Sequence, residues 1–163
     1  MDGLILLICA ALITFQSHSA GMYEEAEKLN INSYCLPQLK MLTNHLSPQG
    51  MFLTVWNTNN ISENSTSHFG QQRNTDGSTT HAITLSPTKE GCNWSYTETV
   101  AFDNTSCSSL KQTYEKLIPN IQVELEDQNY IMLKEPKTTL IIMMTERNNS
   151  ACTVFKTENS LLL

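Results

Sequence analysis

The side chains that could carry acid–base or metal chemistry are few and scattered along this 163-residue chain. Past the N-terminal apolar run, the histidines are His45, His68 and His81, and each stands in a polar stretch typical of a surface position. Glu124 and Glu126 share one face of a predicted strand, but a solvated pair is favoured because the alternating apolar residues need the core. No G-x-S-x-G, H-E-x-x-H or phosphate-loop motif is present. We therefore predict no enzymatic activity, no cofactor and no metal site.

The cysteines favour disulfide bonds over catalysis or zinc binding. Cys9 lies in the N-terminal apolar run, and an even number of cysteines remains after it: Cys35, Cys92, Cys107 and Cys152. No pair has C-x-x-C spacing, so we expect two disulfides, for which three connectivities are possible. Cys92 and Cys107 flank about 14 residues that could double back as a strand and a turn. We therefore predict a Cys92–Cys107 bond, with Cys35 joined to Cys152.

The N-terminal run has the features of a secretory signal. Residues 4–15 are almost wholly apolar and small residues follow them, although the residues before the run carry Asp2 and no lysine or arginine. It is too short to span a bilayer and has the composition of a cleaved signal peptide. A buried helix is the alternative. We predict a signal peptide over residues 1–20 and a single secreted β-rich domain over residues 21–163.

The charge balance disfavours polyanionic partners. The formal net charge is -6, and removing residues 1–20, which contain one acid and no base, leaves -5. A mildly acidic protein lacks the basic surface that binds nucleic acid or anionic membranes. The sequence has no second apolar run of membrane-spanning length, so we expect the product to be released into extracellular fluid.

Five asparagines fit the N-x-[ST] pattern of N-glycosylation without proline in the middle position. Glycans need water, so each occupied site marks a surface loop or a strand end. We expect Asn93, which lies beside Cys92 and Trp94, to be the site most readily left unmodified. The five asparagines are Asn60, Asn64, Asn93, Asn104 and Asn148.

A β-meander in the C-terminal half is the clearest structural pattern. Ile121, Val123 and Leu125 alternate with polar residues, which predicts a half-buried strand over residues 121–126. A turn at residues 127–129 follows. Further strands are predicted over residues 130–134 and 140–144. Residues 151–156 fit a helix or a strand.

Shorter elements are expected before the meander. Helices are predicted by local propensity or by leucine spacing over residues 23–28, 38–46 and 108–117. Strands are predicted over residues 51–57, 80–85 and 95–102. The polar stretch at residues 57–77 predicts a long exposed loop with at most one short edge strand, near His68. No internal repeat is visible in the sequence.

Several stretches have the pattern of a known β-barrel family. Ile131–Glu135 and Leu140–Arg147 look like its last two strands with their closing arginine. Cys152–Phe155 sits where one branch has a cysteine opening a C-terminal helix, and Gly91–Tyr96 looks like a mid-barrel strand of that branch. The chain thus resembles lipocalins, and among them the branch of apolipoprotein M and orosomucoid.

This resemblance implies a mostly β fold, an up-and-down antiparallel barrel of about eight strands with short flanking helices. It also implies transport of a small hydrophobic molecule or lipid in extracellular fluid. The first-strand G-x-W motif of the family reads Gly50-Met51-Phe52 here. Arg147 is therefore expected to lie against Phe52 and close the barrel, or against Trp56 if the register is shifted.

The expected ligand pocket would be lined by side chains of the barrel strands. Transfer of ligand surface from water would drive binding, and methionines would give an adaptable lining. The same residues could instead fill a solid core. The candidate pocket residues are Trp56, Tyr96, Val100, Met132 and Met144.

A secreted protein-binding module is the alternative function. Such a cytokine-like or immune-modulating factor would have a solid β core and a cell-surface receptor as its partner. Two disulfides, dense glycosylation and low charge suit it equally well. A lipid that co-purifies with the protein would favour the carrier, and an empty protein that binds cells would favour the module.

Overall fold

The computed structural model describes residues 22–44, 51–56, 60–148 and 150–160. The predicted signal peptide and His45 lie outside this part of the chain. The described residues form a mostly β structure with three short helices, which confirms the predicted fold class at this level.

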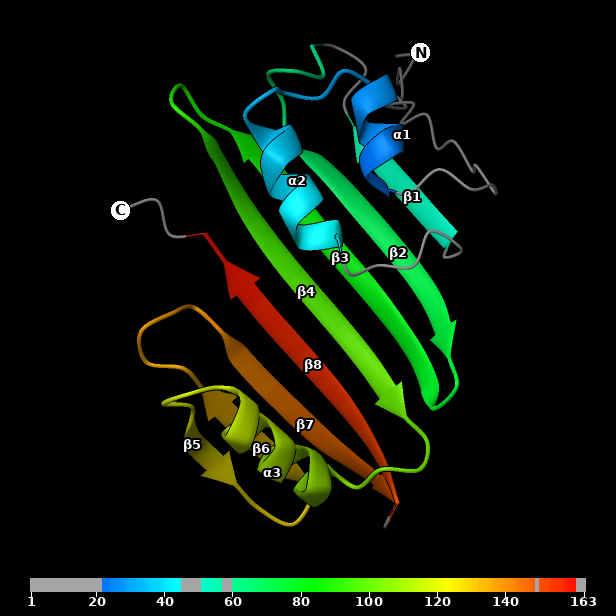
Figure 1. The fold of residues 1–163 in the computed structure, drawn as a ribbon, viewed down its shortest axis with the longest axis vertical. Helices are drawn as coiled ribbons and strands as arrows, with labels where there is room; N and C mark the ends of the chain where they lie inside the picture. The colour runs from blue at the N-terminus through cyan, green and yellow to red at the C-terminus, as the bar shows by residue number, and fades with distance from the viewer. Residues whose placement is uncertain (1–21, 45–50, 57–59, 149, 161–163) are drawn as a thin grey trace, which may run out of the picture.

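The strands form one antiparallel sheet in the order β1-β2-β3-β4-β8-β7-β6-β5 (Figure 1). The central strands are therefore β4 and β8, and the edges are β1 and β5. The strands are β1 (Met51–Trp56), β2 (Thr66–Asn74), β3 (Gly77–Pro87), β4 (Cys92–Phe102), β5 (Gln122–Glu126), β6 (Tyr130–Lys134), β7 (Ile141–Asn148) and β8 (Ala151–Asn159).

The three helices lie on one face of this sheet (Figure 1). α1 (Met22–Lys28) and α2 (Cys35–Thr43) lie over the first four strands, and α3 (Cys107–Leu117) lies over the last four. We call this the helix-covered face. No helix or strand of the described residues covers the other side, which we call the open face. None of the three described helices is long and apolar enough to span a bilayer.

The period of two in the strands separates these faces. In β3, the helix-covered face takes the buried residues His81, Ile83 and Leu85, while Thr80 and Thr84 on the open face are exposed. The helices bury the apolar side of the sheet in two clusters. One cluster lies beneath α1 and α2 and includes Ile83 and Leu85, and the other lies beneath α3. Burial on one side only is what an antiparallel sheet with helices on one face requires.

The chain repeats one arrangement twice. In each half a helix, α2 or α3, is followed by four strands, and the fourth strand of each half lies at the centre of the sheet; α1 precedes this unit in the first half. Each half also has its own disulfide, which joins the first residue of its helix to the start of its fourth strand. These bonds are Cys35–Cys92 and Cys107–Cys152. All four predicted cysteines are thus bridged, but the predicted pairing is wrong.

The two halves meet about an approximate two-fold axis. Thr97 follows Cys92 by the same spacing as Thr157 follows Cys152, and these two threonines face each other in the β4–β8 register. The halves share an order of elements and a disulfide pattern, but most of their residues differ. The repeat is therefore not visible in the sequence.

The sheet does not close into the expected barrel. In an up-and-down barrel β4 would pair with β5, but here β4 pairs with β8 and the two edges stay apart. Arg147, the expected barrel-closing residue, makes its described contacts at the end of β4. Its Nη2 donates to the backbone oxygen of Phe102 at 2.8 Å and to Asp103 Oδ1 at 2.9 Å. The structure does not describe the side chains of Phe52 and Trp56.

The structure corrects two predicted elements and decides one that the sequence left open between helix and strand. The polar loop of residues 57–77 contains β2, a full-length strand whose Thr66 and His68 are buried and hydrogen-bonded to each other. Residues 151–156 belong to β8, a central strand. The predicted half-buried strand at 121–126 is β5, an edge strand, and all five of its residues are exposed.

We predict that the disulfide of the first half contributes strongly to stability. It closes a loop with a sequence separation of 57, so replacing both Cys35 and Cys92 by serine should lower the free energy of unfolding by about 4 kcal/mol in the chain-entropy model. Urea denaturation of both proteins measures this. Peptide mapping without reduction should recover Cys35–Cys92 and Cys107–Cys152, and a Cys92–Cys107 peptide would contradict the structure.

Candidate functional site

The open face has an unusual charge composition for an acidic protein. The paired strand residues that point to this side include the basic residues Arg73 and Lys134 and no acidic residue. Hydroxyl side chains occupy much of its centre, for example Thr80, Thr97 and Thr153. A chain of net charge -6 thus places its carboxylates elsewhere on its strands and loops.

A first hollow, which we call the apolar hollow, lies on the open face over β5–β8. Its volume is about 330 Å³. Three of its large side chains are substantially exposed: Leu125 at 53 %, Tyr130 at 53 % and Met143 at 40 %. The lining residues are Leu125, Tyr130, Ile131, Met132, Met143, Met144, Thr145, Thr153 and Phe155. Exposed apolar side chains gathered in one place mark an interaction site more often than single ones do.

Local turn chemistry presents Tyr130 to this hollow. Asp127 Oδ1 accepts hydrogen bonds from the backbone N–H groups of Asn129 at 2.8 Å and Tyr130 at 2.9 Å. This aspartate turn reverses the chain between β5 and β6, as the sequence predicts. The ladder then sets Tyr130 opposite Thr145 and sets Met132 between Leu125 and Met143.

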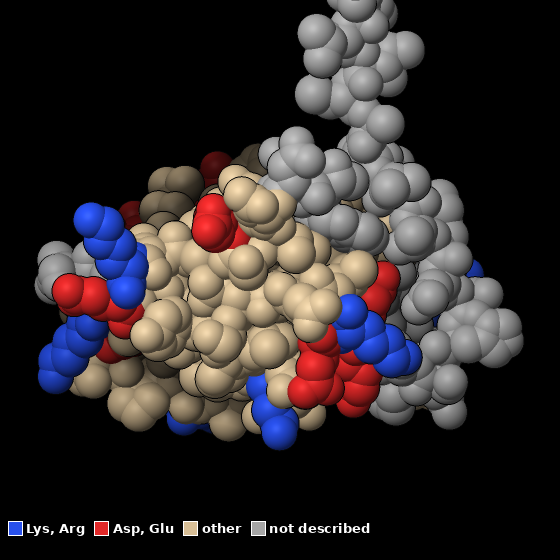
Figure 2. Space-filling view, turned by 90° about the horizontal axis from the view of Figure 1, so that it is seen from above, with Lys and Arg blue, Asp and Glu red and all other residues tan. Residues whose placement is uncertain are grey.

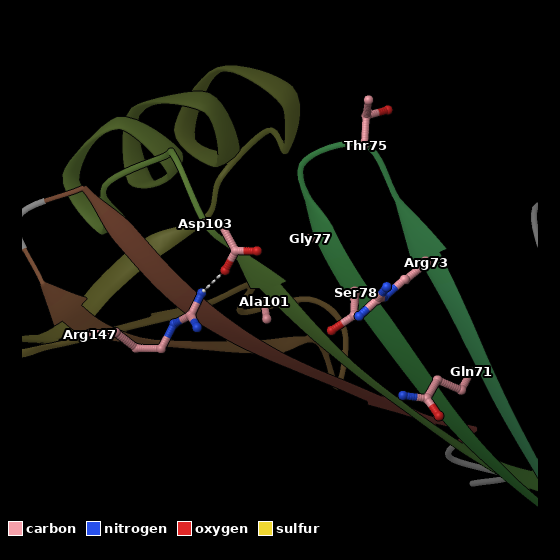
Figure 3. A pocket seen from close by; sticks show the side chains of 8 residues that line it. All are labelled: Gln71, Arg73, Thr75, Gly77, Ser78, Ala101, Asp103 and Arg147. Carbon is pink, nitrogen blue, oxygen red and sulfur yellow. Dashed lines mark hydrogen bonds and ion pairs between the residues drawn. The ribbon is translucent and has the colours of Figure 1, made fainter.

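A second hollow, which we call the arginine hollow, lies at the end of the sheet where β3 and β4 meet (Figure 3). Its volume is about 430 Å³. Figure 3 shows Arg147 reaching toward Asp103 and Arg73 lying over Ser78. The lining residues are Gln71, Arg73, Thr75, Gly77, Ser78, Ala101, Asp103 and Arg147.

Gly77 lines the arginine hollow and lies very close to the backbone of β4. Its φ is +149°, and a Cβ added there would lie 1.7 Å from the backbone oxygen of Ala101. The β2–β3 hairpin therefore requires glycine at this position to approach β4. The backbone N–H of Asp103 also donates to the oxygen of Asp76 at 3.0 Å, which fixes the hairpin tip beside the end of β4.

One row of the ladder connects the two hollows. Ser78 pairs with Ala101, Ala101 with Thr153, Thr153 with Thr145, and Thr145 with Tyr130. Small side chains thus fill the middle of the row. Neighbouring strands are about 4.8 Å apart, so the row from Ser78 to Tyr130 spans roughly 19 Å.

Charged groups are sparse on another side of the molecule as well. Figure 2, a view from above that of Figure 1, shows acidic and basic side chains in small groups around a broad uncharged area. Such a surface gives little long-range steering, so recognition depends on contacts at short range.

Two histidines that were predicted at the surface are buried beneath the helices. His68 is fully buried, and its ring nitrogens are hydrogen-bonded to Thr54 Oγ1 at 3.1 Å and Thr66 Oγ1 at 2.9 Å. His81 Nδ1 lies 2.9 Å from the hydroxyl of Tyr96. Polar neighbours in the sequence suggested exposure, but both rings are buried with hydrogen-bond partners, and Thr54 and Tyr96 come from neighbouring strands that are distant in sequence.

The pKa values of these buried groups follow from desolvation. Burial lowers the pKa of His68 from 6.5 to about 4, so its imidazole is neutral. Burial, together with the carboxylates of Glu98 and Glu158, raises the pKa of Tyr96 well above its usual range. Among the described residues, no group of three His, Cys, Asp or Glu side chains could hold a metal ion.

The structure separates the predicted pocket residues. Tyr96 and Val100 lie on the helix-covered face of β4. Met132 lines the apolar hollow on the open face, and Met144 also borders it but is 1 % exposed and packed in the core. These residues therefore do not share one enclosed pocket. The exposed apolar residues of β5 were missed because alternation predicted that they would face the core.

The described sequon asparagines are accessible to solvent. Asn64 is half-buried and the other four are exposed: Asn60, Asn93, Asn104 and Asn148. Asn104 and Asn148 adjoin Asp103 and Arg147 of the arginine hollow.

No family model, no curated protein and no solved structure was found to match this chain.

We predict that stability decreases in mild acid because of His68. Its folded pKa of about 4 lies below its unfolded value of 6.5, so the unfolded state takes up a proton first as the pH falls. The contribution of His68 to the free energy of unfolding is therefore constant above pH 6.5. It decreases between pH 6.5 and pH 4, by about 3 kcal/mol in total.

Urea denaturation of the wild type and of His68→Gln from pH 7 to 4 measures this loss. The variant should lose less stability over that range. If the variant does not fold, NMR titration of the His68 ring in the wild type remains decisive, and a pKa near 6.5 would contradict the prediction.

Proposed function

We propose that this protein is a secreted binding module that recognises a cell-surface protein through its open face. The observation that carries the proposal is the combination of exposed apolar side chains on that face with the lack of acidic groups among its paired strand residues. Two disulfides, a signal-like N-terminal run and exposed sequons support an extracellular setting.

The chemistry of the open face defines its partner. Leu125, Tyr130 and Met143 would receive apolar side chains of the partner at the centre of the contact. Arg73 and Lys134 are exposed on the same face and would lie against carboxylates. The fitting partner is therefore a protein surface with an apolar centre and acidic groups around it.

A second copy of this chain fits the open face less well. Two such faces would bring the basic residues of both copies together and offer them no strand carboxylate. The edge strand β5 also opposes strand-to-strand pairing, because it carries Glu124 and Glu126 and has a register shift between Val123 and Leu125.

A carrier of a small hydrophobic molecule is the second candidate function. The volume of the apolar hollow, about 330 Å³, lies in the range of small-ligand sites. Mass spectrometry of an organic extract of purified protein separates the two functions. A stoichiometric lipid or hydrophobic metabolite would favour the carrier and displace the module.

We predict that Met143→Glu strongly weakens cell binding without unfolding the protein. A new carboxylate would meet the acidic surface of the partner and remove an apolar contact, so affinity should fall roughly tenfold or more. Met143 is 40 % exposed, so the free energy of unfolding should change by about 0.5 kcal/mol or less. Flow cytometry with fluorescent protein measures binding on a panel of cell types.

The matched control is Met41→Glu, because Met41 is 52 % exposed on α2, away from the open face. This variant should bind like the wild type. Pretreating the cells with trypsin should remove binding, since the partner is a protein. Equal binding by both variants, trypsin-resistant binding, or a dimer that Met143→Glu converts to monomer would each contradict the proposal.

A further inference from the structure

We propose that the arginine hollow binds an acidic sugar, a monosaccharide unit that carries a carboxylate or a sulfate group. The chain has two arginines, Arg73 and Arg147, and both line this hollow although one is on β2 and the other on β7. The two come together because the pairing of β4 with β8 brings the halves into one sheet.

Arg147 is held in place by two contacts and keeps further hydrogen-bond donors available for a ligand. Its Nη2 is fixed by the oxygen of Phe102 and by Asp103 Oδ1. Its Nε and Nη1 groups have no hydrogen-bond partner among the described residues, and 40 % of the side chain is exposed. A guanidinium already ordered by two contacts loses little entropy when it binds an anion.

Arg73 supplies the free cation of the site. Its side chain is exposed and has no ion pair or hydrogen bond with any residue that the structure describes. It faces Ser78 across the β2–β3 ladder, on the open face, and lies over that residue in Figure 3. Arg73 is thus available for the paired hydrogen bonds by which guanidinium groups bind carboxylate and sulfate.

The size and lining of the hollow favour a sugar over a single acidic side chain. A volume of about 430 Å³ is far larger than one carboxylate requires. Gln71, Thr75 and Ser78 can donate and accept hydrogen bonds, and Asp103 can accept them. The hydroxyl groups of a sugar both donate and accept hydrogen bonds, so a lining that offers donors and acceptors suits the part of an acidic sugar that surrounds its charged group.

The arginine hollow shares no lining residue with the apolar hollow at the centre of the proposed protein contact, although Arg73 also belongs to the rim of that contact and one glycoprotein could occupy both. The apolar hollow is the site that Met143→Glu changes, and the arginine hollow is changed by substitutions of Arg73. Failure of one proposal is therefore visible separately from failure of the other.

The test uses the intact protein from a eukaryotic host, treated with sialidase and repurified. Sequons at Asn104 and Asn148 adjoin the hollow, so acidic sugars of the protein itself must be removed first. Three probes share one neutral core: lactose, 3′-sialyllactose and 3′-sulfolactose. Saturation-transfer NMR and calorimetry measure their binding.

We expect at least one of the acidic probes to bind roughly tenfold more tightly than lactose, and binding to weaken as salt increases. Arg73→Ala should bind the acidic probes no more tightly than lactose. Arg73→Lys should keep part of the preference for acidic probes, because lysine keeps the charge but cannot form the paired hydrogen bonds. Lys134→Ala removes one exposed cation from the same face and should leave affinity within about twofold. Met143→Glu should also have no effect.

The proposal is overturned if lactose binds as well as both acidic probes, or if neither acidic probe binds at millimolar concentration. It is equally overturned if Arg73→Ala and Lys134→Ala behave alike. Tighter binding of a hexaglutamate peptide than of either acidic sugar would assign the hollow to acidic side chains of a protein instead.

Discussion

The antiparallel pairing of β4 with β8 is the constraint on which the rest of this structure depends. It joins two helix-plus-four-strand halves into one sheet, with Thr97 facing Thr157 near the approximate two-fold axis. Each half fastens its helix to its own central strand by one disulfide. In the strand register, Cys92 and Cys152 both lie on the helix-covered face, so α2 and α3 are fastened to the same side of the sheet, and all three helices lie there.

The open face is the consequence that matters for function. Along a strand with one solvated face, polar residues on that face alternate with buried residues on the other. Serine and threonine fill this polar position over much of the open face. Over β5–β8 it exposes Leu125, Tyr130 and Met143 instead, and these residues contribute no core packing of the kind that holds Ile142 and Leu133. Apolar side chains gathered on one exposed face mark interaction sites, and these residues form the centre of the partner contact that we propose.

Local patterns in the sequence predicted the β-meander, the turn at Asp127 and the bridging of four cysteines, because these depend on neighbouring residues. The sheet order was not predictable in this way, since nothing local to β4 distinguishes β8 from β5 as its partner. The barrel, the disulfide pairing and the closing role of Arg147 all failed for this reason. β2 was missed because its buried Thr66 and His68 satisfy each other and look like loop residues in sequence.

Oxidative footprinting of methionines tests the central claim most directly. In the free protein Met143 and Met41 should both be oxidised, since they are 40 % and 52 % exposed, while Met144 at 1 % should be protected. On cells that bind the protein, Met143 should become protected and Met41 should stay reactive. Protection of Met143 already in the free protein, or equal oxidation of both residues in the free and cell-bound states, would contradict the account.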